Sequence, residues 1–445
     1  MVNSFNAFLS ARTRALILAG ALALGAPVSA QQSAETERAL DSLTAVVSAL
    51  QAQVEGLSVA VNGAAAQPAA QARAGGTYMN VGFVGLTDFG WSTEPDVESL
   101  QVGDHDPRVR GWTLPNGELT LDGAVDPYFQ AATSIVYKLD GDGETGVELE
   151  EMYFLTTSLP GNLQLKGGQF FAEFGRQNTL HPHSWGFADQ PLVLNRMFGA
   201  EGLRSQGFRL SWLLPTSFYT EASLGVFNSG GETASSFRSE ESPEIHGGEA
   251  VERGVHDARD LLYVPRLSTS IELNDTQTLL FGASAALGPN NSGTGSDTRI
   301  FGGDLYWKWK SARAMQGFPF VSFQTEGIWR RYEAGRRSAA ESPFLPILPA
   351  ETLSDAGMYA QLLWGIKPLL VAGLRAEVVD GQGGAFESAL RADRQRVSPN
   401  LTWYPSEFSK IRVQYNYDLR PDIGVDHSFW MQIEFLLGAH AAHKF

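Results

Sequence analysis

Residues 146–215 read GVELEEMYFLTTSLPGNLQLKGGQFFAEFGRQ, then NTLHPHSWGFADQPLVLNRMFGAEGLRSQ, then GFRLSWLLP. Two runs of alternating apolar and polar residues meet at the turn PGN, residues 160–162, as in a β-hairpin. The second run then gives way to residues 175–205, which have no clean period and are rich in Arg, His, Asp, Trp and Pro. Alternation returns from Phe208 onward. The stretch therefore predicts a hairpin, a long loop and a returning strand.

The same pattern repeats from Thr77 to Phe445. Alternating segments of about ten residues are separated in turn by short turns and long loops, which is the signature of a transmembrane β-barrel. The connections predict an all-β barrel of about 16 antiparallel strands, with the count open between about 14 and 18. The alternative is a soluble sandwich of two sheets, but it would bury lone charges at a high cost in free energy. A barrel of about 16 strands predicts a water-filled lumen.

Alternation also assigns residues to the two faces of the predicted wall. Phe301 and Trp307 fall on one face of a strand, and Asp304 falls on the other. We expect the apolar face to contact lipid and the charged face to line the lumen. Basic and acidic residues on the lumen face nearly balance, so the wall alone predicts no strong preference for either sign of solute. The predicted lumen-wall residues are Lys166, Arg209, Asp304, Lys308, Lys310, Glu326, Arg375, Glu377 and Arg412.

Four segments of the chain differ in composition. Residues 1–30 have a basic start, an apolar run and a small-residue cleavage point, which predicts a signal peptide and export. Residues 31–62 carry Leu and Val at heptad spacing and predict a short coiled-coil helix in the periplasm, or else one amphipathic helix packed on the body. Residues 63–76 predict a flexible linker, and residues 77–445 form the predicted barrel.

Composition excludes several classes of function. A formal net charge of −16 argues against nucleic acid as a partner, because phosphate binding needs a basic surface. The absence of cysteine excludes a disulfide framework and a thiolate metal site. The sequence has no G-x-S-x-G motif, no H-E-x-x-H motif and no phosphate-cradling glycine loop, so we predict that the protein is not an enzyme. No cofactor is expected.

The run VELEEMYFLTTSLPGNLQLKGGQFFAEFGRQN, residues 147–178, resembles the phosphate-selective porin O/P family. GAVDPY at 123–128 extends the resemblance, while HPHSW at 181–185 and the ending GAHAAHKF resemble a subgroup labelled zinc-regulated outer-membrane receptors. The resemblance implies a trimeric barrel of about sixteen strands whose third external loop folds inward. By our count, the loop 175–205 is the third long connection. The lysines that line the constriction in phosphate-selective members have no cluster here, so phosphate selectivity is not implied.

The loop 175–205 is the predicted constriction of the lumen. If it folds into the barrel, arginines opposite carboxylates create a transverse field that orients solutes and sets ion preference. The alternative is that these residues pair with one another and with the wall, and so hold the loop in place. The ionisable residues of this loop are Arg176, His181, His183, Asp189, Arg196, Glu201 and Arg204.

Two pairs of histidines are candidate zinc ligands. His181 and His183 share the loop, and His440 and His443 stand near the last residue. Zinc needs three or four ligands, so neither pair forms a site by itself. If His181 and His183 bind zinc, the metal should raise the melting temperature or block conductance.

Pattern and resemblance together predict an outer-membrane porin that lets small charged solutes or ions diffuse passively through a barrel narrowed by the loop 175–205. Two alternatives stay open: a zinc-linked uptake receptor, and a structural protein that tethers the envelope through its N-terminal helix. Outer-membrane lipid and lipopolysaccharide are the expected neighbours. The resemblance implies a homotrimer, whereas Val and Leu at the heptad positions favour a dimer.

Overall fold

The computed structural model describes residues 78–139, 143–239, 243–251, 254–315, 317–338, 347–386, 388–421 and 423–438. The chain divides into two units, residues 1–76 and 77–445. The expected signal peptide, coiled-coil helix and linker lie outside the described residues, as do His440 and His443.

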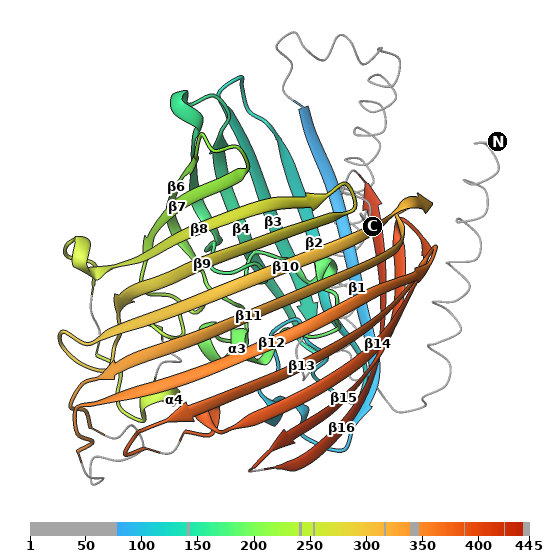
Figure 1. The fold of residues 1–445 in the computed structure, drawn as a ribbon. Helices are drawn as coiled ribbons and strands as arrows, with labels where there is room; N and C mark the ends of the chain where they lie inside the picture. The colour runs from blue at the N-terminus through green and yellow to red at the C-terminus, as the bar shows by residue number, and fades with distance from the viewer. Residues whose placement is uncertain are drawn as a thin grey trace, which may run out of the picture. The chain divides into compact units, whose positions relative to one another are not determined.

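Sixteen antiparallel strands form one closed barrel in which each strand pairs with its neighbours in the sequence (Figure 1). The last strand pairs with the first, so the sheet has no free edge. The predicted all-β barrel and its number of strands are confirmed. The strands are β1 (Tyr78–Ser92), β2 (Gly111–Ala124), β3 (Phe129–Leu139), β4 (Thr145–Thr156), β5 (Leu163–Phe171), β6 (Arg204–Leu213), β7 (Tyr219–Asn228), β8 (Leu261–Asn274), β9 (Gln277–Pro289), β10 (Asp297–Met315), β11 (Phe318–Ala334), β12 (Glu351–Lys367), β13 (Leu370–Gln382), β14 (Arg394–Ser406), β15 (Ser409–Arg420) and β16 (Gly424–Gly438).

Short turns and long loops lie at opposite ends of the barrel. The first strand begins at the end where the last strand finishes, because Gly82 pairs with Gly438. Connections at that end are short, such as residues 125–128 between β2 and β3. Connections at the other end include the long segments 93–110 and 172–203. The loop expected at 175–205 is therefore the third connection at the long-loop end.

The two faces of the wall differ as alternation predicts. On β10, the side chain of Phe301 is exposed on the outer face, whereas Asp304 is buried on the inner face. On β15, Tyr417 is exposed on the outer face, while Arg412 and Asp418 are buried inside. Burial confirms the assignment of apolar side chains to the outside and charged side chains to the lumen on these strands.

Register shifts in β2 and β4 interrupt this alternation near the lumen loop. In β2, the pairing with β1 shifts beside Pro115, whose missing N–H suits an irregular position. In β4, the pairing with β3 skips Glu150, which lies between the paired residues Leu149 and Glu151. As a result, Glu150 and Glu151 are adjacent in sequence and are both buried.

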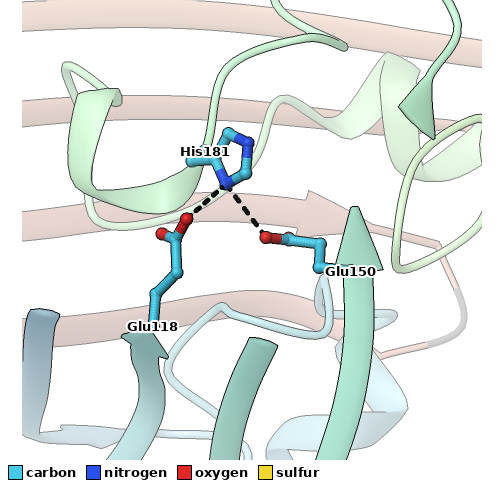
Figure 2. Close-up of side chains that lie close together, drawn as sticks. All are labelled: Glu118, Glu150 and His181. Atoms are coloured by element: carbon cyan, nitrogen blue, oxygen red, sulfur yellow. Dashed lines mark ion pairs between the residues drawn. The ribbon is translucent and has the colours of Figure 1, made fainter. Parts of the chain in front are cut away.

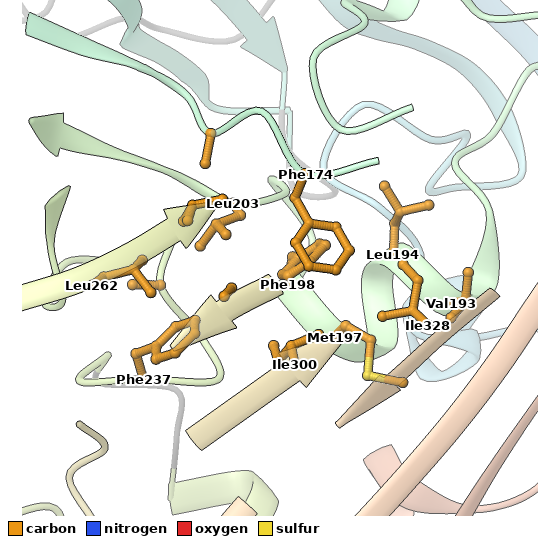
Figure 3. Close-up of a cluster of buried hydrophobic side chains, with 14 of the residues drawn as sticks. Phe174, Val193, Leu194, Met197, Phe198, Leu203, Phe237, Leu262, Ile300 and Ile328 are labelled. Atoms are coloured by element: carbon orange, nitrogen blue, oxygen red, sulfur yellow. The ribbon is translucent and has the colours of Figure 1, made fainter. Parts of the chain in front are cut away.

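The connection between β5 and β6, residues 172–203, lies inside the barrel, and we call it the lumen loop (Figure 1). It carries the helix α3 (Leu192–Phe198), which contacts β11, β12 and β13. Its apolar side chains form a buried cluster with inward-facing residues of β7 to β13 (Figure 3). Removing this apolar surface from water stabilises the loop inside the barrel by about 25 cal/mol per Å². The lumen-loop residues labelled in Figure 3 are Phe174, Val193, Leu194, Met197, Phe198 and Leu203.

The remaining helices are short. They are α4 (Pro243–His246) and the 3₁₀ helices η2 (Val97–Leu100), η3 (Pro160–Asn162), η4 (Pro182–Ser184), η5 (Ala258–Asp260) and η6 (Ala389–Arg391). Within the part of the chain that the structure describes, no helix has both the length and the apolar character needed to cross a membrane.

Candidate functional site

The lumen loop crosses the barrel from β5 to the far wall. In a closed ring of sixteen strands in sequence order, β13 lies opposite β5. The loop bonds to β11, β13, β14 and β15 on that far side. It also contacts β2 and β4 on the near side through His181. The predicted loop 175–205 thus corresponds to the lumen loop, with Arg204 as the first residue of β6.

Glu326 of β11 holds the start of the lumen loop. Its Oε1 accepts hydrogen bonds from the backbone N–H of Gln177 at 2.7 Å, the backbone N–H of Arg176 at 3.1 Å and the hydroxyl of Tyr359 at 2.8 Å. The guanidinium of Arg176 lies over the ring of Tyr306, 4.1 Å from its centroid. Glu326 is only 1% exposed, so these protein groups replace water as the hydrogen-bond donors to its carboxylate.

Asp189 holds the middle of the lumen loop to three strands. Its carboxylate pairs with Arg375 of β13 and, at 3.1 Å, with Arg396 of β14. The side-chain amide of Asn416 on β15 donates to it at 3.0 Å. Burial by itself raises the pKa of a carboxyl, but Arg396 and Arg375 more than offset it and hold the pKa of Asp189 at about 2. Asp189 is therefore ionised at neutral pH.

Two charged wall residues bind the backbone of the lumen loop directly. The Glu377 carboxylate accepts a hydrogen bond from the N–H of Leu192 at 2.7 Å, and the carboxylate also pairs with the arginines that hold Asp189. Arg412 of β15 donates to the carbonyl oxygens of Trp185 at 2.8 Å and Phe187 at 2.7 Å. These bonds satisfy loop backbone groups that would otherwise be buried without partners.

His181 lies among glutamates on the near wall (Figure 2). Its Nδ1 is 3.0 Å from Oε1 of Glu118 on β2 and 2.9 Å from Oε2 of Glu150 on β4, while its Nε2 is 3.0 Å from Oε2 of Glu151. Nδ1 of His183 is 3.1 Å from the other oxygen of Glu118. Burial disfavours a charged imidazole, but Glu118 and Glu150 hold the pKa of His181 well above its usual value.

A second acidic cluster surrounds Lys138. The Lys138 ammonium pairs with Asp104, with Glu148 at 3.1 Å and with Glu201 at 3.4 Å. Arg204 pairs with Glu148 and, at 2.8 Å, with Glu201. Two of the predicted loop residues, Glu201 and Arg204, thus bond to each other and to the near wall.

Arg196 lies on α3 beside a cavity of about 250 Å³. It donates to the carbonyl oxygen of Ala392 at 2.6 Å, and its Nη1 is 3.9 Å from Asp355. Among the described residues, that Nη1 has no hydrogen-bond partner. Burial lowers the pKa of Arg196 to about 10, so it stays charged at neutral pH. Other charged residues lining this cavity are Glu98, Glu244, Arg330 and Arg394.

Two further predicted wall residues meet acidic groups near the ends of the lumen loop. Lys166 of β5 is 3.5 Å from Glu151, and its ammonium lies over the ring of Tyr153. Arg209 of β6 pairs with Glu173 of the lumen loop. Both basic residues are therefore engaged with the protein's own groups.

The predicted wall residues of β10 lie on one face of that strand. Asp304 pairs with Arg266 of β8 at 2.6 Å. Lys308 lies over the ring of Phe320, 5.3 Å from its centroid, and Lys310 follows two residues later. Both lysines are half-buried.

Four side chains of the His181 cluster are not among the residues that sequence reasoning singled out: Glu118, Glu150, Glu151 and His105. Nδ1 of His105 is 3.1 Å from the carbonyl oxygen of Pro115, and its Nε2 is 3.6 Å from Glu150. For β4 a signal was present, because two adjacent glutamates break an otherwise regular alternation and a bulge accounts for the break.

Comparison with known proteins identifies the fold. No protein-family model matches the sequence, so the resemblance to the phosphate-selective porin O/P family stays a prediction. The outer membrane channel DcaP of Acinetobacter baumannii is similar in structure at 12% identity and a TM-score of 0.51, over 82% of this chain and 97% of that chain. The anion-selective porin from Comamonas acidovorans is similar at 9% identity and a TM-score of 0.51, over 81% and 100%. At these identities the likeness establishes the fold alone.

One relative is similar in sequence. An uncharacterized protein of Aquifex aeolicus is 32% identical over 359 residues, which span 76% of this chain and 70% of the Aquifex protein. Identity of this level over most of both chains is a family relationship. The chain therefore belongs to the same family as this Aquifex aeolicus protein, and its sixteen-stranded barrel has the fold of the outer-membrane porins.

Proposed function

We propose that the protein is an outer-membrane porin through which small charged solutes and ions diffuse passively. The observation that carries this proposal is the lumen loop, which crosses the interior of a closed sixteen-stranded barrel and bonds to the far wall. A barrel of this size holds more space than its own inward side chains fill, so it can enclose an aqueous channel. The lumen loop narrows that channel.

A loop held in place suits passive passage. Asp189 is ionised and paired with two arginines, and Glu326 accepts hydrogen bonds from the backbone where the loop begins. The buried apolar cluster holds α3 against the wall between these anchors. A constriction fixed at this many points selects solutes by its width and its charge rather than by moving.

The cavity beside α3 supplies the charge that acts on solutes. Arg196, Arg330 and Arg394 line the same space as Glu98 and Glu244. Charges of both signs around one passage create a transverse electric field. This field orients dipolar solutes and changes the relative permeability of cations and anions. Arg196 lines this space from α3, and because its side chain is only 3% exposed we expect its charge to act on solutes through the field rather than by contact.

The side chains on the outer face of the barrel support the proposed location in the outer membrane. Trp112, Trp212 and Trp403 are exposed on that face at 62%, 44% and 51%, although large aromatic side chains are usually buried in water-soluble proteins. Lipid-facing barrels carry such side chains as an apolar band with aromatic girdles. The proposal includes lipid and lipopolysaccharide as neighbours, a homotrimer as the assembly, and no catalytic role.

The test is conductance of the purified full chain in planar lipid bilayers. We expect stepwise current increases whose size grows in proportion to salt concentration, as for an open aqueous pore. A variant in which residues 192–198 are replaced by a Gly-Ser segment of equal length should give larger steps, because α3 no longer narrows the lumen. Folded protein that gives no steps would exclude the porin function, and unchanged steps in the variant would exclude the constriction.

A further inference from the structure

Three carboxylates and three imidazoles meet where the lumen loop touches the near wall. Nδ1 of His181 is 3.0 Å from an oxygen of Glu118 and 2.9 Å from an oxygen of Glu150 (Figure 2). One ligand atom from each of these three residues lies within 4.8 Å of the other two. Ligand atoms around one zinc ion, each at about 2.0–2.2 Å from the metal, are separated by about 3 Å. The two distances from Nδ1 therefore already match the spacing of ligands around one metal ion, and the two carboxylate oxygens lie within 4.8 Å of each other.

The hydrogen bonds of His181 leave its Nδ1 facing carboxylates. Nε2 of His181 is hydrogen-bonded to Glu151 at 3.0 Å, and a carboxylate can only accept, so Nε2 carries the proton. Nδ1 faces Glu118 and Glu150, so a metal ion that displaces the proton from Nδ1 would lie between the Nδ1 lone pair and the two carboxylates. Carboxylate, imidazole and metal in this order form the usual outer-shell arrangement of protein metal sites.

Glu150 is a buried carboxylate whose ion pairs with described residues are to imidazoles. It is 1% exposed, and among the described residues neither of its oxygens has a hydrogen-bond partner. Nδ1 of His181 also lacks one, although two carboxylate oxygens lie near it. A buried carboxylate without hydrogen bonds is costly unless a charge compensates it. A metal ion between these atoms supplies that charge.

His105 contacts the oxygen of Glu150 that does not face His181, and it is our candidate for a fourth ligand. Its Nδ1 is 3.1 Å from the carbonyl oxygen of Pro115, and a carbonyl only accepts, so Nδ1 is the protonated nitrogen. Its Nε2 is then directed toward Glu150, 3.6 Å from Oε1. Two carboxylates and two imidazoles make a ligand set that suits zinc and neighbouring divalent metals.

The second acidic cluster shows how the same barrel neutralises carboxylates without a metal. There, Lys138 reaches into the centre of Asp104, Glu148 and Glu201, and Arg204 pairs with two of them. In contrast, the ion pairs that Glu118 and Glu150 form with described residues are all to histidines. A histidine can release the proton from one ring nitrogen near neutral pH and bind a metal ion at that nitrogen.

We propose that Glu118, Glu150 and His181 bind one divalent transition-metal ion, with His105 as the fourth ligand. The ion would join β2, β4 and the lumen loop at one point. Zinc is the probe that we choose, since it accepts oxygen and nitrogen ligands in a four-coordinate site. This proposal does not rest on the porin function, because metal binding is measured without solute passage.

The experiment is zinc titration of the full-length protein, purified without a polyhistidine tag and stripped with EDTA. His440 and His443 are replaced by asparagine in every sample, so they contribute no ligands. We expect one zinc per chain by calorimetry and elemental analysis, and a cobalt-loaded form with visible d–d absorption. Glu150→Gln and His181→Asn should each weaken zinc binding by about 100-fold or more. Glu151→Gln, which alters the hydrogen-bond acceptor of His181 and the ion pair with Lys166, should weaken it by about 10-fold.

Matched controls separate a built site from scattered surface binding. His256→Asn alters an imidazole whose side chain is 80% exposed, and Glu201→Gln alters the cluster that Lys138 already neutralises. Both should leave zinc affinity unchanged. If Glu150→Gln prevents folding, His105→Asn serves in its place with an expected loss of about 10-fold. Failure to bind zinc, or equal affinity in folded His181→Asn, would show that the histidines hold protons and form ion pairs only.

Discussion

Glu377 on β13 accepts a hydrogen bond at 2.7 Å from the backbone N–H of Leu192, the first residue of α3, so the far wall of the barrel fixes where that helix begins. The same carboxylate is 2.7 Å from Arg375 and 2.9 Å from Arg396. It therefore joins the backbone of the lumen loop to the arginines that hold Asp189.

Glu377→Gln should loosen the lumen loop. The substitution removes the negative charge between Arg375 and Arg396, and breaking a buried ion pair from one side costs about 3–5 kcal/mol. We expect a loss of that size in the free energy of unfolding, together with noisier open-channel current. Urea unfolding and single-channel recording measure the two effects. Glu272→Gln, at an exposed position on β8, is the control and should change stability by less than about 0.5 kcal/mol.

Asp189 should make stability sensitive to acid. Its pKa of about 2 lies below the value of about 3.9 expected in the unfolded chain, because Arg396 and Arg375 stabilise the carboxylate. The resulting stabilisation, about 3 kcal/mol, is complete above about pH 5 and is lost as the pH falls through 2. Asp106 works in the opposite direction, because burial and the charge of Asp189 raise its pKa to about 6.

The measurement is urea unfolding of the wild type and Asp189→Asn between neutral pH and pH 2. The difference in free energy between the two proteins should shrink as the pH falls from 5 toward 2. A difference that stays the same down to pH 2 would contradict the assignment of this acid sensitivity to Asp189.

Arg196→Gln should shift ion preference toward cations. A unit charge about 5 Å from a permeating ion in water changes the energy of that ion by about 0.8 kcal/mol, which corresponds to a change of about two- to four-fold in permeability ratio after screening. Reversal potential in a potassium chloride gradient gives this ratio directly. Arg313→Gln, at an exposed position near the end of β10, is the control. Equal shifts in both variants would mean that ions bypass the cavity beside α3.

Two adjacent glycines on β10 test the packing of the lumen loop. A Cβ atom on Gly302 would come within 2.6 Å of the ring of Phe174, so this glycine lets the ring lie against the wall. A Cβ atom on the neighbouring Gly303 would meet nothing closer than a carbonyl oxygen at 3.9 Å. Gly302→Leu should therefore cost about 1–3 kcal/mol and increase conductance as the loop is displaced. Gly303→Leu should do neither, and comparable effects in both variants would exclude a specific contact with Phe174.

The barrel was predictable because alternation is a local signal. Successive side chains of a strand point to opposite faces of the sheet, so the apolar residues on either side of Arg412 are enough to place Arg412 on the lumen face. The position of the lumen loop as the third long connection followed from counting turns. Neither inference needed to know which strands lie opposite each other.

The contacts of the lumen loop were not predictable in this way. The backbone N–H of Ala188 bonds to the side chain of Gln414, 226 positions away in the sequence. No periodicity links residues so far apart. The short helix α3 is apolar because it packs on inward-facing side chains such as Ile300 and Ile328, which the alternating pattern does not mark as a binding surface. The bulge at Glu150 likewise depends on the pairing of β4 with β3.

The lumen loop reaches both sides of the ring, with His181 against β2 and β4 and Asp189 against β13 and β14. It therefore acts as a strut between two separate arcs of the cylinder. Lateral pressure from the surrounding bilayer would flatten an empty ring into an oval. Flattening along the lumen loop would first have to break the contacts between the loop and the wall. The contacts of the lumen loop with the wall therefore also support the cross-section of the barrel.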